Sequence, residues 1–253
     1  LERNLMVECV RKYPIHGIQF DYMRYGGEDE CFCAGCRERF AAWYGQPVVN
    51  WPDSCHAGGE LAEKYFDWRV HLITSSVAEI SQAIHAVRPE ARVSLAARTA
   101  AWPQRRRHDA QHWEDWVDKG YLDFLCPMDY TGSVTRLTSW LKYQASVVNG
   151  RMPLYAGLGT TYDQRLNHTA IASDLVMAAR ELGADGVIFF SWNETFSDML
   201  PYLARGVSAQ PSVTMPHETP QILFRLPASD AERSLPTFMP GQQMQASVNV
   251  EMV

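Results

Sequence analysis

The sequence predicts an α/β fold in which parallel strands are joined by helices. Short apolar runs have the length of buried strands, and they occur at residues 15–21, 92–98, 122–129, 152–158 and 186–192. Apolar residues at three- and four-residue spacing predict helices between or after these runs, at residues 66–87, 113–119, 134–148, 169–182 and 199–205. Regular alternation of strand and helix implies parallel strands, because each crossover helix returns the chain to the same end of the sheet.

The composition is that of a globular protein. The 253 residues are 46% hydrophobic and 21% charged, which excludes intrinsic disorder for most of the chain. The net charge of −6 argues against a broad phosphate-binding surface, so we expect no nucleic-acid partner. No run approaches the roughly 18 apolar residues that a membrane span needs, so we expect none.

The strand ends favour a barrel over a doubly wound sheet. No strand leads into a glycine-rich phosphate loop, and polar or aromatic residues follow the strands instead. The sequence therefore predicts an α/β fold of the (β/α)8 TIM-barrel type. Only five strands are predicted where a barrel has eight, so we expect an incomplete barrel of about five C-terminal βα units. Three such units would precede residue 1, and the open barrel in isolation would be unstable or self-associate.

Two domains are predicted along the chain. Residues 1–205 hold all 8 tryptophans and all the predicted barrel elements. Residues 206–253 form a proline-rich tail or linker to a further module, with short strand-like runs at 221–226 and 246–250.

Several motifs resemble those of the bacterial glycosyl-hydrolase-like family 10. The matching segments occur in the family's order, at residues 17–25, 31–40, 68–69, 122–130, 155–158 and 186–192. The resemblance covers about residues 1–205 and implies a TIM-barrel hydrolase of polysaccharides or peptidoglycan-type glycans. It also implies a secreted or cell-envelope location, and the family's first strands have no counterpart in this sequence.

Three carboxylates are candidates for glycosidic-bond hydrolysis, which requires a pair. Asp21 and Asp129 each follow an apolar strand and precede a tyrosine, so we expect both at the barrel mouth, Asp21 as nucleophile and Asp129 as acid/base. Glu194 follows the last strand and could replace Asp129, bind a hydroxyl, or only begin the next helix. An Asp after a strand can also simply cap the next turn, and the spacing leaves both a retaining and an inverting separation open.

Candidate substrate-binding residues surround these carboxylates. Arg24 and Arg98 could hold a carboxylate ionised, bind an acidic sugar substituent, or form structural salt bridges in the rim. Asn193 adds a polar contact. Four aromatic residues either offer flat faces for sugar stacking or pack in the core and rim: Tyr22, Tyr130, Tyr162 and Trp192.

Cysteines cluster directly after the Asp21 strand. Cys31, Cys33 and Cys36, with Cys55 and His56 further on, could form a structural zinc site or contain a disulfide. We favour a disulfide or free thiols over zinc, and we expect no cofactor for the reaction itself.

Three functions remain open from the sequence. The first is a glycosidase acting on a carbohydrate substrate, and the second is a non-catalytic carbohydrate-binding or scaffold barrel. The third and weakest is an interaction module stabilised by a structural zinc ion. A pair of carboxylates at the barrel mouth favours the first, because a pure binding protein has more use for aromatic residues than for a carboxylate pair.

Overall fold

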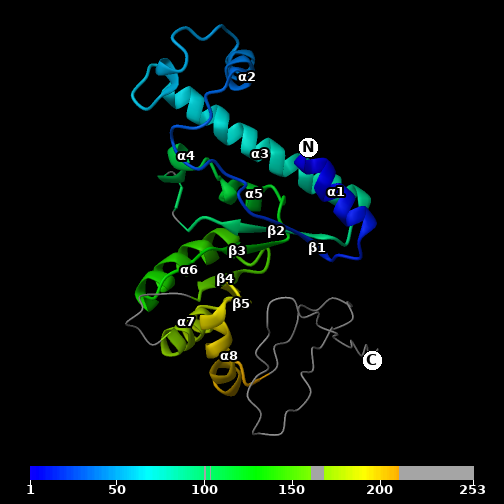
Figure 1. Ribbon diagram of the computed structural model, residues 1–253, viewed down its shortest axis with the longest axis vertical. Helices are drawn as coiled ribbons and strands as arrows, with labels where there is room; N and C mark the ends of the chain where they lie inside the picture. The colour runs from blue at the N-terminus through cyan, green and yellow to red at the C-terminus, as the bar shows by residue number, and fades with distance from the viewer. Residues whose placement is uncertain (100, 103, 161–167, 211–253) are drawn as a thin grey trace. The chain divides into compact units, whose positions relative to one another are not determined.

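Helices and parallel strands alternate along the chain, as Figure 1 shows. The computed structural model describes residues 1–99, 101–102, 104–160 and 168–210. The five predicted strands are confirmed as β1 Gly17–Phe20, β2 Arg92–Ala97, β3 Phe124–Pro127, β4 Tyr155–Gly159 and β5 Gly186–Phe190.

The strands lie side by side in the order in which they occur in the chain. β1, β2 and β3 form one parallel sheet, and β4 pairs in parallel with β5. Isolated parallel bridges join Leu125 to Leu154 and Met128 to Gly157, which connects β3 to β4. A doubly wound sheet would reverse its strand order in the middle, so this single direction of winding agrees with the predicted parallel βα units of a barrel. Within the described residues β1 and β5 each pair on one side only, and the strands do not close into a barrel.

Five helices follow the predicted periodicity. They are α3 Ala62–Val87, α5 Trp113–Asp118, α6 Val134–Val148, α7 His168–Glu181 and α8 Glu194–Arg205. Helix α6 begins where the Ser133 side chain accepts a hydrogen bond from the Arg136 N–H and ends at Asn149 in the left-handed conformation. Helix α8 begins five residues before the predicted start at 199, because Asn193 caps it through the Phe196 N–H.

Three further α-helices and one 3-10 turn were not predicted. They are α1 Glu2–Lys12, α2 Ala34–Tyr44, α4 Gln104–His108 and the turn Asp53–Cys55. Helix α1 buries only Val10, and α2 buries only Cys36 and Phe40. The apolar residues of α2 are spread around the helix and leave almost no periodicity for a sequence pattern to reveal, whereas α1 is amphipathic and was missed despite that pattern.

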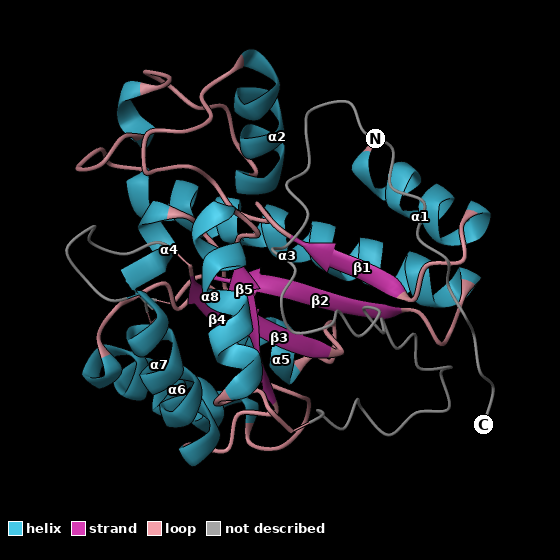
Figure 2. Ribbon diagram, turned by 60° about the horizontal axis from the view of Figure 1, so that its bottom comes forward, coloured by secondary structure: helices cyan, strands magenta, loops and turns pink. Residues whose placement is uncertain are grey.

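The main core lies between the strands and the helices that cover them (Figure 2). Strand residues Val93, Leu95 and Leu125 are fully buried in it, together with Val77 and Ile84 of α3. A separate apolar cluster of Cys36, Phe40, Val48, Cys55, Tyr65 and Trp68 lies outside this core, in the long connection after β1 and the start of α3.

The described elements belong to one compact unit, Leu1–Ala209. The predicted domain boundary at residue 205 and the tail at 206–253 remain predictions. The strand-like runs at 221–226 and 246–250 lie outside the described residues.

Candidate active site

The predicted site residues come from the carboxyl ends of neighbouring parallel strands. Asp21 follows β1, Arg98 follows β2, Asp129 and Tyr130 follow β3, and Trp192 follows β5. Parallel strands in one sheet end at the same edge, so these residues share that edge of the fold. This is the edge at which α/β barrels place their functional groups.

Asp21 is the exposed carboxylate of the site. Its side chain is 48% exposed and accepts hydrogen bonds from the Tyr22 N–H at 2.7 Å and from Arg24 at 3.0 Å. The Arg24 guanidinium is itself mostly buried and lies 4.3 Å from the centre of the Tyr22 ring. Arg24 therefore fixes one Asp21 oxygen in an ion pair, and its role toward a substrate stays a prediction.

Asp129 is the buried carboxylate of the site. Its side chain is 0% exposed, and its Oδ1 accepts a hydrogen bond from Gln144 Nε2 of α6 at 2.8 Å. Asp129 Oδ2 and Gln144 Oε1 are both buried without a hydrogen-bond partner. A proton on Asp129 Oδ2 would remove the charge from this buried oxygen and turn it into a donor.

Burial sets the protonation behaviour of Asp129. It raises the pKa of this carboxyl from its ordinary 3.8 to about 6, although hydrogen bonds from Gln144 and Thr99 act in the opposite direction. A carboxyl group taken out of water favours its neutral form, so Asp129 holds its proton until close to neutral pH. This is the property that a general acid needs.

Tyr130 follows Asp129 directly. The pKa of its phenol is raised to about 12, chiefly by burial with smaller contributions from the negative charges of Asp21 and Asp129, while Arg24 lowers it. The Tyr130 ring stacks on Phe190 with ring centres 5.3 Å apart, and the tyrosine remains 42% exposed. Tyr130 is therefore a partly exposed aromatic residue at the end of β3, next to Asp129.

Two other predicted aromatic residues are highly exposed. Trp192 is 73% exposed and packs edge-on against Phe196, and Tyr22 is 76% exposed. A large aromatic ring that is this exposed is available for stacking. Tyr162, the fourth predicted stacking residue, lies outside the described residues.

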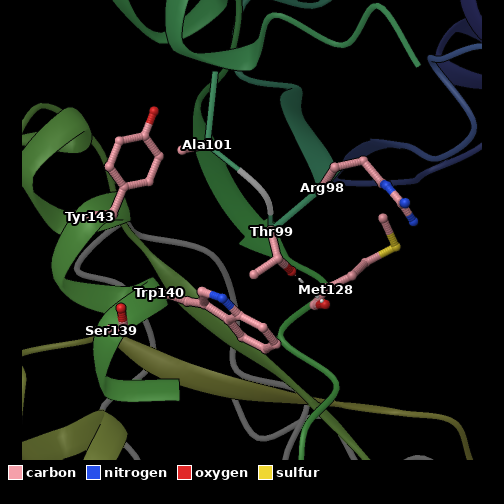
Figure 3. A pocket seen from close by; sticks show the side chains of 7 residues that line it. All are labelled: Arg98, Thr99, Ala101, Met128, Ser139, Trp140 and Tyr143. Atoms are coloured by element: carbon pink, nitrogen blue, oxygen red, sulfur yellow. Dashed lines mark hydrogen bonds between the residues drawn. The ribbon is translucent and has the colours of Figure 1, made fainter. Parts of the chain in front are cut away.

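Arg98 lines a pocket together with Met128, the residue before Asp129 (Figure 3). An ion pair holds its side chain. Its Nε lies 3.2 Å from the buried carboxylate of Asp109, and this is the structural salt bridge that was one of its predicted roles. The pocket has a volume of about 560 Å³ and is lined by Arg98, Thr99, Ala101, Met128, Ser139, Trp140 and Tyr143. It therefore lies between the ends of β2 and β3 and helix α6, next to the backbone that carries Asp129.

Glu194 and Asn193 lie at the start of α8. Glu194 is exposed in the first helical turn, where a negative charge stabilises the helix dipole. The Asn193 side chain caps α8 and donates a hydrogen bond to the Thr160 hydroxyl at 3.0 Å. Both residues thus stabilise the start of α8.

The cysteines of the connection after β1 gather into one group. The sulfur atoms of Cys31, Cys33 and Cys36 lie within 4.8 Å of one another, and all six cysteines are free thiols. Cys55 does not join them. It is buried beside Ser54, so the fourth ligand suggested by the sequence is not part of this group.

Three residues of the site have no counterpart among the predictions. Gln144 holds Asp129, Phe190 supports Tyr130, and Trp140 lines the pocket beside them. Gln144 carried a usable signal, because it interrupts the buried stripe of α6 formed by Leu137, Leu141 and Val148. A polar residue on an apolar helix face needs a buried partner, and here the partner is Asp129.

Comparison with known proteins identifies relatives of the chain. It is 26% identical over 174 residues to the glycosyl hydrolase DigH of Escherichia coli O6:H1, covering 61% of this chain and 36% of DigH. It is 23% identical over 189 residues to an S-layer-related protein of Niallia circulans, covering 61% of this chain and 12% of that protein. The chain thus spans well under half the length of these relatives.

A solved structure agrees with the observed architecture. The PgaB (BpsB) glycoside hydrolase domain from Bordetella bronchiseptica superimposes with a TM-score of 0.62 at 12% sequence identity. The match covers 81% of this chain and 60% of that domain. It confirms the predicted α/β fold with parallel βα units of the TIM-barrel type.

No helix in the described ranges is both long and apolar enough to cross a membrane.

The family Glycosyl hydrolase-like 10 matches residues 3–163. The matched segment contains Asp21, Asp129 and the three clustered cysteines, and it makes up more than half of the 253 residues. The chain belongs to the glycosyl hydrolase-like 10 family, as its motifs predicted.

Proposed function

We propose that this chain carries the catalytic carboxylates of a glycosidase that cleaves O-glycosidic bonds in a polysaccharide or peptidoglycan-type glycan. The observation that carries the proposal is Asp129, a buried carboxyl at a strand end whose pKa is raised to about 6. The relatives named glycosyl hydrolase and glycoside hydrolase domain support the same class of reaction.

The two carboxylates have environments suited to two different roles. Asp129 is buried with one unpartnered oxygen, so it is the proton donor to the glycosidic oxygen as the bond to the anomeric carbon breaks. Asp21 is exposed and paired with Arg24, so it is the carboxylate that attacks the anomeric carbon or deprotonates the water that does so. Unlike environments for two carboxyl groups are the usual basis of this division of roles.

The burial of Asp129 adds a requirement to the mechanism. Neither of its oxygens reaches solvent here, so substrate contact needs an opening movement at the end of β3. Tyr130 follows Asp129 directly, is partly exposed and stacks on Phe190. We infer that a sugar ring displaces Tyr130 or stacks on it, with Trp192 as a second stacking surface.

The test is a glycan panel assayed with the full-length gene product and its Asp21→Asn variant. Release of reducing ends from one glycan class by the wild type, and a loss of about 10²–10⁴-fold in the variant, is the expected result. The anomer released first, read by NMR, then distinguishes retention from inversion.

The matched control is Asp118→Asn. Asp118 is an exposed carboxylate paired with Arg151, and it ends α5 just before the sheet, at the edge opposite the strand carboxyl ends. Its loss should leave turnover unchanged. If Asp21→Asn also retains full turnover while folded, the assignment of Asp21 fails. Glycan binding without any cleavage by the wild type would favour the non-catalytic carbohydrate-binding barrel instead.

A further inference from the structure

A compact group of three sulfur atoms lies in the long connection between β1 and α3. Cys31, Cys33 and Cys36 surround the start of α2, where Cys33 is the residue that precedes the helix. Cys31 and Cys33 are exposed, and Cys36 is buried. No residue of this group takes part in the proposed hydrolysis.

The sulfur separations fit coordination to one metal ion. Cys31 Sγ and Cys36 Sγ lie 3.6 Å apart, and all three sulfur atoms lie within 4.8 Å of one another. Two thiolates bound to one tetrahedral zinc at about 2.3 Å have their sulfur atoms about 3.8 Å apart. A disulfide would need about 2.05 Å, so the geometry fits a shared ion far better than a bond between two of the sulfurs.

A hydrogen-bond donor lies beside the sulfur group. The Arg39 guanidinium donates to the sulfur of Cys36 at 3.4 Å. Such a donor orients a thiolate ligand, and the Arg39 charge offsets the net negative charge of three thiolates on one divalent ion.

The segment that holds the cysteines has a small core of its own. Phe32 stacks on Tyr65 with ring centres 5.1 Å apart, Phe40 meets Tyr65 edge-on, and the Tyr65 hydroxyl donates to the Cys31 carbonyl. This aromatic cluster encloses one side of the sulfur group and leaves the side of Cys31 and Cys33 open. A small core of this kind is the setting in which a structural metal adds most stability.

We propose that Cys31, Cys33 and Cys36 bind one zinc ion as three thiolates, with water in the fourth position. Thiolate ligands select zinc among the divalent ions available to a protein. No fourth Cys, His, Asp or Glu of the described residues joins the group within 4.8 Å, which leaves the fourth position to solvent. The ion would hold the connection that begins directly after Asp21 and that Arg69 anchors through the carbonyls of Gly27 and Glu28.

The test measures metal content and coordination in the full 253-residue chain, purified under reducing conditions without chelators. Elemental analysis should find one zinc per chain in the wild type, and cobalt in place of zinc should give an intense thiolate-to-cobalt charge-transfer band with tetrahedral visible bands. Cys33→Ser should lose both signals and remain folded, because Cys33 is exposed.

Cys9→Ser is the matched control, since Cys9 lies on α1 outside the sulfur group. It should keep one zinc and the cobalt spectrum. Equal zinc content in Cys33→Ser and the wild type would overturn the proposal. A metal-free wild type would also overturn it, whether its mass shows six free thiols or a disulfide within the group.

Discussion

Asp21 and Asp129 occur in the same sequence pattern and end in opposite environments. Each comes after an apolar strand and precedes a tyrosine, yet Asp21 is 48% exposed and Asp129 is 0% exposed. The cause is the next element of the chain. After β1 comes a long connection with its own small core, whereas β3 leads through a short turn into helix α6, which brings Gln144 onto Asp129. The pattern places a carboxylate at the edge of the sheet, but the next element decides whether water reaches it.

The largest expected effect of this difference is on activity. Asp129→Asn should lower turnover by about 10²–10⁴-fold, because an amide cannot donate a proton to the leaving oxygen. A substrate with a good leaving group, such as an aryl glycoside, should lose much less, since its departure needs little protonation. The ratio of turnover on the two substrates, measured for wild type and variant, checks the role. An equal loss on both would place Asp129 outside the acid step.

The two carboxylates should also differ in their effect on the stability of the fold. There, in contrast to activity, replacing Asp129 should be favourable at neutral pH. The raised pKa of Asp129 means that the folded state binds its proton more tightly than the unfolded state, so wild-type stability falls as pH rises from about 3.8 to about 6. Above that window the ionised carboxyl costs about 3 kcal/mol. Asp129→Asn should therefore be more stable than the wild type at pH 7, with the gain vanishing towards pH 4.

The matched comparison is Asp21→Asn. It removes an exposed ion pair with Arg24, and this should cost less than about 1 kcal/mol with little change across the same window. Urea unfolding of both variants at pH 4 and pH 7 gives the four free energies needed. A destabilised Asp129→Asn at pH 7 would mean that the ionised carboxyl is well accommodated in the fold.

The smallest expected effect concerns binding alone. Trp192→Ala removes an exposed ring, so the fold should be retained while glycan affinity weakens by about 1 kcal/mol, or roughly fivefold. The rate constant kcat should stay within a factor of about two of the wild-type value, because Trp192 touches neither carboxylate in the proposed mechanism. Trp192→Phe, which keeps an aromatic face, should recover most of the affinity. A large fall in kcat with unchanged KM would instead link Trp192 to the chemistry.

Local sequence patterns were sufficient for the strands and the long helices. Alternation of apolar runs and helical periodicity predicted β1 to β5, and Pro89 and Asn149 marked helix ends near where they occur. Helix α2 was missed because its apolar residues do not gather on one face, whereas α1 is amphipathic and its pattern was available in the sequence. The sequence predicted parallel βα units but not which strands pair, since pairing depends on contacts between residues far apart in the chain.

The site was predictable as a list of residues and not as an arrangement. Asp21, Asp129 and Tyr130 could be chosen because functional groups gather where parallel strands end. The pairing of Gln144 with Asp129 and the stacking of Tyr130 on Phe190 join segments that are separated in the chain, so neither has a local signature. The raised pKa of Asp129 depends on its burial, which only the packed structure defines.

The most direct test of Asp129 as the proton donor is the titration of its side-chain carboxyl by carbon-13 NMR, with the resonance assigned by its absence in Asp129→Asn. We expect a midpoint near 6, because a buried acid keeps its proton close to neutral pH. A midpoint near the ordinary value of 3.8 would contradict the assignment, because Asp129 would then be ionised at working pH and could not serve as the proton donor.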